Sequence, residues 1–283
     1  MYYIIVNFVN YWLNHLSSKK KIYYWSPSLV DIATNMAVIN SAYSLNKYNS
    51  CYESYVLNFF GEFERFKEEI KKKNIKLIDH YKKNIWNFFP KYGKIKSRIS
   101  FVLIFILSFF PLKNLIKNKK PDFLIIHLIT SLPLFLLIFF NFQTKFILRI
   151  SGYPRMNFFR KFLWKLASKK IFLVTCPTIN TMKYIKSLNI IDNEKIKLLY
   201  DPIIEIKKIN LKKNQSLNFK NYFFSAGRLT KQKNFLFLCK AFKNIIKKDR
   251  NTKLLIAGDG EEKKEIEKYI INNDLEDNIK LIG

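Results

Sequence analysis

Two successive units of apolar run, glycine turn and helical run, between residues 222 and 283, constrain the fold of this 283-residue chain most strongly. In chain order these segments are an apolar run at 223–226, Gly227, a helical run at 234–248, an apolar run at 253–257, Gly258 and a helical run at 261–272. Strands that alternate with helices favour a parallel, doubly wound sheet, and a glycine turn before a helix presents backbone N–H groups to an anion. The pattern therefore predicts an anion site at these turns, although a turn that serves packing alone has the same pattern.

Two cations lie in the first turn, where Arg228 follows Gly227 directly and Lys233 comes five residues later. Arg228 offers phosphate oxygens a planar fork of donors and Lys233 offers a compact, movable charge, so the two would complement each other. Gly227 leaves room for a phosphate to approach the backbone. An exposed ion pair is the alternative for Arg228, and a solvated side chain is the alternative for Lys233.

These residues carry a resemblance to a known family. The matching positions are Gly227-Arg228-Leu229, Lys233, Ala241-Phe242, Leu254-Leu255-Ile256 and Gly258-Asp259-Gly260-Glu261. Over residues 222–283 they resemble the second half of glycosyltransferase family 4, the retaining GT-B enzymes that use nucleotide sugars. The resemblance implies an α/β protein with two Rossmann-like, doubly wound parallel-sheet domains. It also implies a donor-diphosphate site formed by Gly227, Arg228, Lys233 and Gly258.

The resemblance further implies the chemistry. The donor would be a nucleotide-diphosphate sugar of the UDP or GDP type, and the acceptor would be a glycan or a lipid-linked molecule. A hexosyl group would be transferred with retention, through an oxocarbenium-like transition state and without an obligatory metal. Cations at the first turn would then stabilise the charge that develops on the leaving diphosphate.

Short apolar runs alternate with helical runs from residue 21 to residue 199 as well, which predicts a first parallel sheet. We expect an N-terminal extension at 1–20, a first Rossmann-like domain at 21–206, a lysine-rich linker at 207–220 and a partial second domain at 221–283. Family members carry two glutamates seven residues apart further along the second domain, and the chain ends at Gly283 before such a pair. We therefore expect a truncated enzyme, with a non-catalytic nucleotide-sugar-binding remnant as the alternative.

Candidate acceptor-side residues follow the expected strands of the first domain, because ligands bind at the carboxyl ends of strands in such sheets. They are Asp31, Asn35, His127, Thr130, Arg149, Ser151 and Gly152. His127 is the candidate catalytic residue, which would orient or deprotonate an acceptor hydroxyl, and a hydrogen-bonded core histidine is the alternative. Arg149, Arg155 and Arg160 would suit an anionic acceptor such as a phosphorylated lipid, or form a solvated loop.

One segment departs from the family pattern. Many members have a glycine-rich loop after the first strand, whereas residues 26–34 contain no glycine. Close approach of a donor phosphate to this part of the backbone is therefore in doubt.

The formal charge of +29 comes almost entirely from lysine, because only 7 of the 50 basic residues are arginine. Arginine is the preferred reader of phosphates and bases, so the charge does not predict nucleic-acid binding. An anionic membrane surface fits better, because basic residues flank the apolar run at 99–112. We expect that run to form an interfacial helix or, alternatively, a buried core helix. The longer run at 123–142 is expected to form a strand, a turn and a helix rather than a membrane span.

Other features point to a reducing compartment. Cys51, Cys176 and Cys239 are widely separated and show no metal-ligand spacing, which predicts structural thiols and no metal site. Residues 1–16 are apolar but lack a basic start and a cleavage site, so an added helix or a membrane-touching segment is expected rather than a signal peptide. We expect a cytoplasmic protein that is peripheral at the inner face of the cell membrane.

Overall fold

The computed structural model describes residues 19–28, 33–81, 85, 88–89, 94–202, 205–212 and 222–283. They belong to two compact units, Met1–Glu205 and Ile206–Gly283, which are called unit 1 and unit 2 below. The predicted segment at 1–16 and the candidate residue Asp31 lie outside the described residues.

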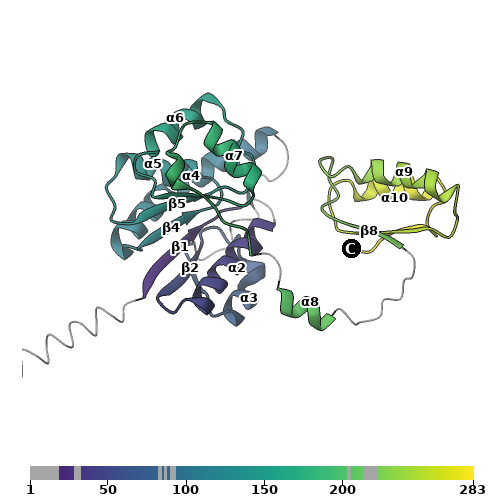
Figure 1. The fold of residues 1–283 in the computed structure, drawn as a ribbon, viewed down its shortest axis with the longest axis horizontal. Helices are drawn as coiled ribbons and strands as arrows, with labels where there is room; N and C mark the ends of the chain where they lie inside the picture. Colours follow the sequence, from purple (N-terminus) through teal and green to yellow (C-terminus); the bar gives the residue numbers. More distant parts are fainter. Residues whose placement is uncertain are drawn as a thin grey trace, which may run out of the picture. The chain divides into compact units, whose positions relative to one another are not determined.

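Unit 1 is built on a seven-stranded parallel sheet with the strand order β3-β2-β1-β4-β5-β6-β7 (Figure 1). Its strands are β1 Lys20–Trp25, β2 Tyr52–Asn58, β3 Lys76–Asp79, β4 Phe123–Ile126, β5 Lys145–Arg149, β6 Leu173–Cys176 and β7 Ile196–Leu198. The chain order reverses between β1 and β4, so the carboxyl ends of these two strands form the switch point at which such sheets bind ligands. The predicted doubly wound sheet is confirmed.

Helices cover both faces of this sheet (Figure 1). They are α2 Ala33–Tyr48, α3 Lys67–Lys72, α4 Lys94–Lys119, α5 Ser131–Phe139, α6 Phe158–Ala167 and α7 Ile179–Ser187, with short 3₁₀ turns at Glu64–Phe66 and Asn193–Lys195. Strand β1 shows why both faces need cover: Tyr23 and Trp25 enter the core beneath α4, α5 and α6, while Tyr24 enters the core beneath α2 and α3. Burial on both faces explains the nearly continuous apolar runs of these strands.

Helix α4 is longer than the predicted run at 99–112, because it continues through the basic segments on either side. Ile104, Leu112 and Ile116 are buried at helical spacing and pack into the core of unit 1. The opposite face is apolar and exposed, so α4 is a core helix on one side and an unpartnered apolar helix on the other. By length and composition, Arg98–Lys119 is also capable of crossing a membrane, with a mean hydropathy of 2.1.

The apolar run at 123–142 forms strand β4 and then helix α5, as the sequence predicts. Asp122 precedes the strand and accepts a hydrogen bond from the backbone N–H of Lys21 at 2.8 Å. Thr130 precedes α5, and Ile129 in the intervening loop has a φ of 46°. A β-branched residue in this left-handed region is a strained outlier, and such strain is concentrated at functional sites.

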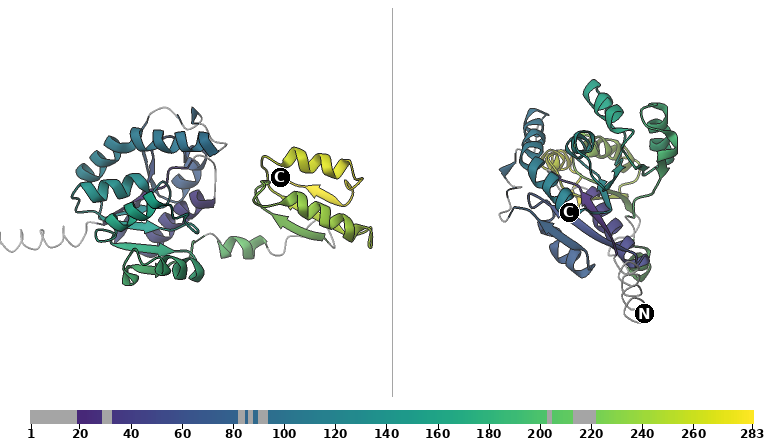
Figure 2. Two further views of the ribbon diagram at one scale, coloured as in Figure 1. Left: turned by 90° about the horizontal axis from the view of Figure 1, so that it is seen from above. Right: turned by 90° about the vertical axis from the view of Figure 1, so that its left-hand side faces the viewer.

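Unit 2 is a three-stranded parallel sheet with the order β10-β9-β8 and two helices, α9 and α10, on one of its faces (Figures 1 and 2). The elements are α8 Ile206–Lys212, β8 Tyr222–Ala226, α9 Phe235–Ile246, β9 Lys253–Ala257, α10 Lys263–Ile271 and β10 Ile279–Leu281. Helix α8 lies in the segment that was expected to be a linker. The core of unit 2 packs Phe242 and Ile266 of the two helices against Leu254, Ile256 and Ile279 of the sheet.

Candidate functional site

The two glycine turns of unit 2 lie directly against each other at the carboxyl ends of β8 and β9. The backbone N–H of Gly227 donates to the carbonyl of Ala257 at 2.9 Å, and that of Leu229 donates to the carbonyl of Asp259 at 2.9 Å. A Cβ atom on Gly258, whose φ is +142°, would lie 1.9 Å from the Gly227 carbonyl oxygen. Packing therefore explains why residue 258 is a glycine, and its predicted contact with a diphosphate stays a prediction.

The first turn presents its two cations to solvent. Arg228 and Lys233 are exposed, and within the part of the chain that the structure describes neither side chain has an ion pair or a hydrogen bond. Leu229 between them is fully buried and anchors the turn, and Asn234, with a φ of 54°, reverses the backbone at the start of α9. The hydroxyl of Thr230 is buried without a partner. An anchored turn with two uncompensated cations is suited to binding an anion.

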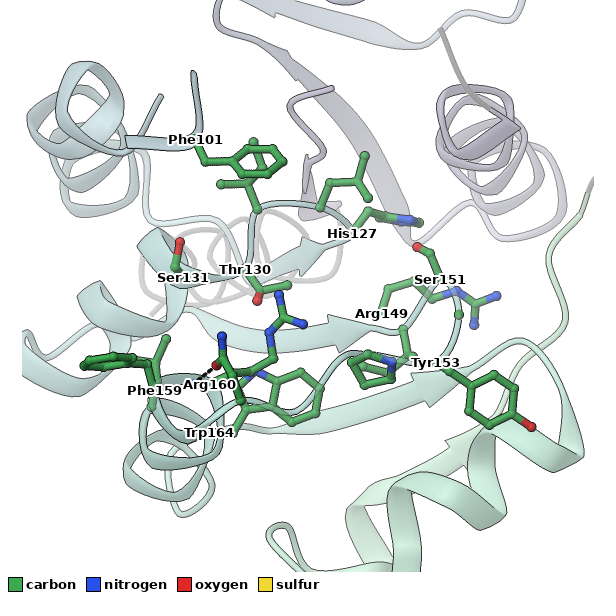
Figure 3. Close-up of a pocket in the computed structure, with 17 residues that line it drawn as sticks. Phe101, His127, Thr130, Ser131, Arg149, Ser151, Tyr153, Phe159, Arg160 and Trp164 are labelled. Carbon is green, nitrogen blue, oxygen red and sulfur yellow. Dashed lines mark hydrogen bonds between the residues drawn. The ribbon is translucent and has the colours of Figure 1, made fainter. Parts of the chain in front are cut away.

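A cavity of about 490 Å³ lies in unit 1 at the carboxyl ends of β4 and β5 (Figure 3). Five of the predicted acceptor-side residues line it, namely His127, Thr130, Arg149, Ser151 and Gly152. The sixth described candidate, Asn35, does not line it, and its buried amide lies 3.5 Å from the carbonyl of Glu62. The carboxyl-end rule thus brings together residues that are 25 positions apart in the sequence.

Arg149 is held by the protein itself. Its guanidinium is buried, forms an ion pair with Asp201 and donates a second hydrogen bond to the carbonyl of Leu199. Figure 3 shows the Arg149 head pointing away from that of Arg160. Arg149 therefore forms part of the cavity wall, while its charge is already compensated.

His127 is buried between the cavity and the core, with its ring 6.1 Å from that of Tyr24. Burial, together with the nearby charge of Arg149, lowers the pKa of His127 to about 3. A group with this pKa is neutral at ordinary pH and is a weak base. The geometry favours a neutral imidazole that orients a ligand by hydrogen bonding over one that removes a proton.

We expect His127 and Glu62 to give unit 1 opposing dependences of stability on pH. The neutral form of His127 is favoured on folding, so its contribution is complete above pH 6.5 and falls as the pH is lowered toward 3. Burial raises the pKa of Glu62 to about 7, so its contribution is complete below pH 4.5 and is lost as the pH rises toward 7. Between these limits each group contributes a slope of about 1.4 kcal/mol per pH unit, of opposite sign.

The measurement is urea unfolding followed by tryptophan fluorescence between pH 4.5 and 6.5. The wild-type free energy of unfolding should change little with pH in this window. Glu62→Gln should unmask a loss of stability on acidification, and His127→Gln should unmask a gain. Equal pH slopes in the two variants would contradict the assignment.

Three further residues of the cavity were not singled out by the sequence analysis or were only grouped by charge. Trp164 is buried and its indole N–H has no partner within the described residues. Asn157 caps α6 by accepting from the backbone N–H of Arg160 at 2.9 Å. Arg160 itself projects into the cavity between Thr130 and Trp164 (Figure 3). The asparagine before a helical run was a visible capping signal, whereas nothing local marks the indole as a cavity donor.

Within the described residues, no group of three His, Cys, Asp or Glu side chains could hold a metal ion. Cys176 and Cys239 are buried and Cys51 is exposed, and all three are free thiols. The two candidate sites therefore rest on cations, hydroxyls and N–H donors.

Comparison with known proteins gives one family match and one curated relative. A family model described as glycosyl transferases group 1 matches residues 206–283, which include both glycine turns. An uncharacterized glycosyltransferase of Methanocaldococcus jannaschii is 30% identical over 263 residues, covering 84% of this chain. The chain spans 60% of the length of that relative.

Solved structures confirm the GT-B-like fold. The structure of TarM from S. aureus in complex with UDP and two glycan ligands has a TM-score of 0.63 and 14% identity, with 93% of this chain and 77% of TarM covered. A glycosyltransferase from Rickettsia africae has a TM-score of 0.60 and 17% identity, with 94% and 68% covered. The UDP-GlcNAc 2-epimerase of Neisseria meningitidis bound to UDP-GlcNAc has a TM-score of 0.59 and 15% identity, with 93% and 70% covered. At these identities the likeness concerns the fold alone.

Proposed function

Because the chain belongs to the glycosyl transferases group 1 family, we propose that it transfers a sugar from a nucleoside-diphosphate donor to an acceptor bound by unit 1. The observation that supports this function best is the first glycine turn of unit 2, with Arg228 and Lys233 exposed and uncompensated. Members of the family use nucleotide sugars, and the matched segment contains this turn.

Each part of the turn has a physical role in such a transfer. As the bond between the sugar and the diphosphate breaks, negative charge grows on the leaving diphosphate. Arg228 can donate two parallel hydrogen bonds to phosphate oxygens, and Lys233 adds a mobile charge. The turn is fixed by the buried Leu229, so little reorganisation is needed when the charge develops.

The finer assignments are part of the same proposal. The family resemblance supports a UDP- or GDP-hexose donor, transfer with retention and a glycan or lipid-linked acceptor. The exposed apolar face of α4 and the lysine-rich composition support a peripheral position at the inner face of the cell membrane. His127 would orient the acceptor hydroxyl as a neutral imidazole.

The test is calorimetric titration of the chain with UDP and GDP. We expect Arg228→Ala to weaken binding of the preferred diphosphate by about 10- to 100-fold, because a charge-assisted hydrogen bond contributes about 1.5 to 3 kcal/mol. Lys233→Ala should have a smaller effect, because a single movable charge replaces the bidentate contact.

Arg250→Ala is the matched control. Arg250 is also an exposed arginine of unit 2, but it precedes β9 and lies at the amino end of that strand. Its removal changes the net charge equally and should leave the affinity within about twofold, the level of a screened surface charge. Equal affinities of the wild type and Arg228→Ala would overturn the donor-site assignment.

A further inference from the structure

The cavity of unit 1 is suited to an anion because two helices begin at its wall. Thr130 and Ser131 at the start of α5 and Asn157 at the start of α6 all line the cavity. The first turn of a helix has N–H groups without intrahelical partners and the positive end of the helix dipole. Both features favour a negatively charged ligand.

Two side-chain donors in the same cavity have no acidic partner. Arg160 is half-buried, its guanidinium donates one hydrogen bond to the carbonyl of Arg155 at 2.8 Å, and its head projects into the cavity (Figure 3). Trp164 is 2% exposed, and its indole N–H lacks a partner within the described residues. An unpaired buried donor is costly, so an acceptor oxygen on a ligand would compensate it. None of the residues recorded as lining the cavity is an aspartate or a glutamate.

The rim of the cavity is aromatic. Phe101 of α4 and Phe159 of α6 both line it, and Phe159 is 80% exposed. From this rim, each helix extends an exposed apolar stripe whose members recur every four residues. The stripe of α4 consists of Val102, Ile106 and Phe110, and the stripe of α6 consists of Phe158, Phe162 and Leu166.

Exposed basic residues accompany both stripes. They are Arg98 and Lys117 on α4, and Arg155, Lys161 and Lys165 in or next to α6. Large apolar side chains beside lysine and arginine are the composition of surfaces that insert among acyl chains while contacting anionic head groups. Charge complementarity thus points to an anionic bilayer as the occupant.

We propose that the cavity of unit 1 binds the phosphate-bearing head group of a membrane-embedded acceptor lipid, while the apolar stripes of α4 and α6 insert into the bilayer around it. Arg160, the Trp164 indole N–H and the starts of α5 and α6 hold the phosphate. The aromatic rim lies at the level of the acyl chains, so the acceptor reaches the cavity without leaving the membrane. The word acceptor rests on the proposed function, but the binding event does not.

Co-sedimentation of the full chain with vesicles tests the proposal. The vesicles contain phosphatidylcholine alone or phosphatidylcholine with a minor fraction of phosphatidic acid, and a separate titration uses inorganic phosphate. We expect the phosphatidic acid vesicles to bind more strongly than the phosphatidylcholine vesicles. Equal binding to the two vesicle types would overturn the proposal.

Variants separate the stripes from the cavity. Phe158→Ser combined with Phe162→Ser should weaken vesicle binding by about 100-fold and leave binding of inorganic phosphate unchanged, because both side chains are solvent-exposed without a membrane. Tyr48→Ser, at an exposed aromatic residue of α2 on the other face of the sheet, is the control and should have no effect. Unchanged vesicle binding by the double phenylalanine variant would contradict insertion of the α6 stripe.

Arg160→Gln and Trp164→Phe test the head-group contacts. Each should reduce both phosphate binding and the preference for phosphatidic acid, by about 10-fold for Arg160 and by less for Trp164. Lys169→Gln removes one exposed charge after α6, outside the cavity, and is the matched control. Phosphate binding that depends on Arg160 in a chain that does not bind vesicles would identify a soluble phosphate ligand and overturn the membrane source.

The outcome is independent of the donor site. UDP affinity should be the same in all of these unit 1 variants, because Arg228 and Lys233 belong to unit 2. Loss of UDP binding in Arg228→Ala with intact vesicle binding, or the reverse, would show which of the two proposals fails.

Discussion

Replacing Gly258 by alanine should destabilise unit 2 by about 3 to 5 kcal/mol, which combines the cost of overpacking with that of a backbone region that L-residues rarely adopt. The new Cβ would lie 1.9 Å from the carbonyl oxygen of Gly227, and the φ of Gly258 is +142°. The obstacle is backbone, which cannot rotate aside as a flexible side chain can. A loss of this size is comparable to the whole stability of a unit as small as this one.

The measurement is native-state hydrogen exchange of the β9 amides, Lys253–Ala257, because the described tryptophans lie in unit 1 and do not report on unit 2. Protection of β9 should fall by at least 100-fold. Gly227→Ala is a graded comparison, because its Cβ would lie 3.3 Å from the ring of Phe235, which can shift. Gly152→Ala has nothing within 4 Å and should be neutral for unit 1. Wild-type protection in Gly258→Ala would contradict the packing role.

Strand positions of unit 1 were predictable because each strand is a short apolar run between polar turns. The predicted strand at 145–150 corresponds to β5, and the helix at 158–167 corresponds to α6. Helix α4 was harder, because Pro111 lies inside it. A proline removes the N–H that would bond the carbonyl of Leu107, and Tyr81 compensates by donating its hydroxyl hydrogen to that carbonyl at 2.9 Å. A contact across 26 residues has no local sequence signal.

The candidate sites show the same division. The carboxyl-end rule correctly brought His127, Thr130 and Arg149 to one cavity, because chain order and strand ends are readable from the sequence. The sequence could not distinguish a glycine that admits a phosphate from one that admits a carbonyl, as Gly258 does. Nor could it show that the unpaired indole of Trp164 lies in that cavity, since the helix face that a residue occupies depends on tertiary packing.

The buried ion pair between Arg149 and Asp201 should be the second most sensitive element of the protein. Asp201→Ala would leave a guanidinium that is 4% exposed with only the Leu199 carbonyl as a partner. Breaking one side of a buried pair costs about 3 to 5 kcal/mol, because the remaining charge stays desolvated. We expect unit 1 to lose this much free energy of unfolding, measured from urea midpoints by the fluorescence of Trp25 and Trp164.

Two comparisons separate the desolvated charge from a general effect of mutation on unit 1. Glu53→Ala breaks the more exposed pair with Lys76 and should cost less than about 1 kcal/mol. The double variant Arg149→Met with Asp201→Leu removes both charges and should recover most of the loss, because an apolar pair no longer carries the desolvation penalty. A double variant as unstable as Asp201→Ala would show that the pair is needed for its geometry. In that case Arg149 would fix the segment after β7 against the cavity wall through its hydrogen bonds, and its charge would be secondary.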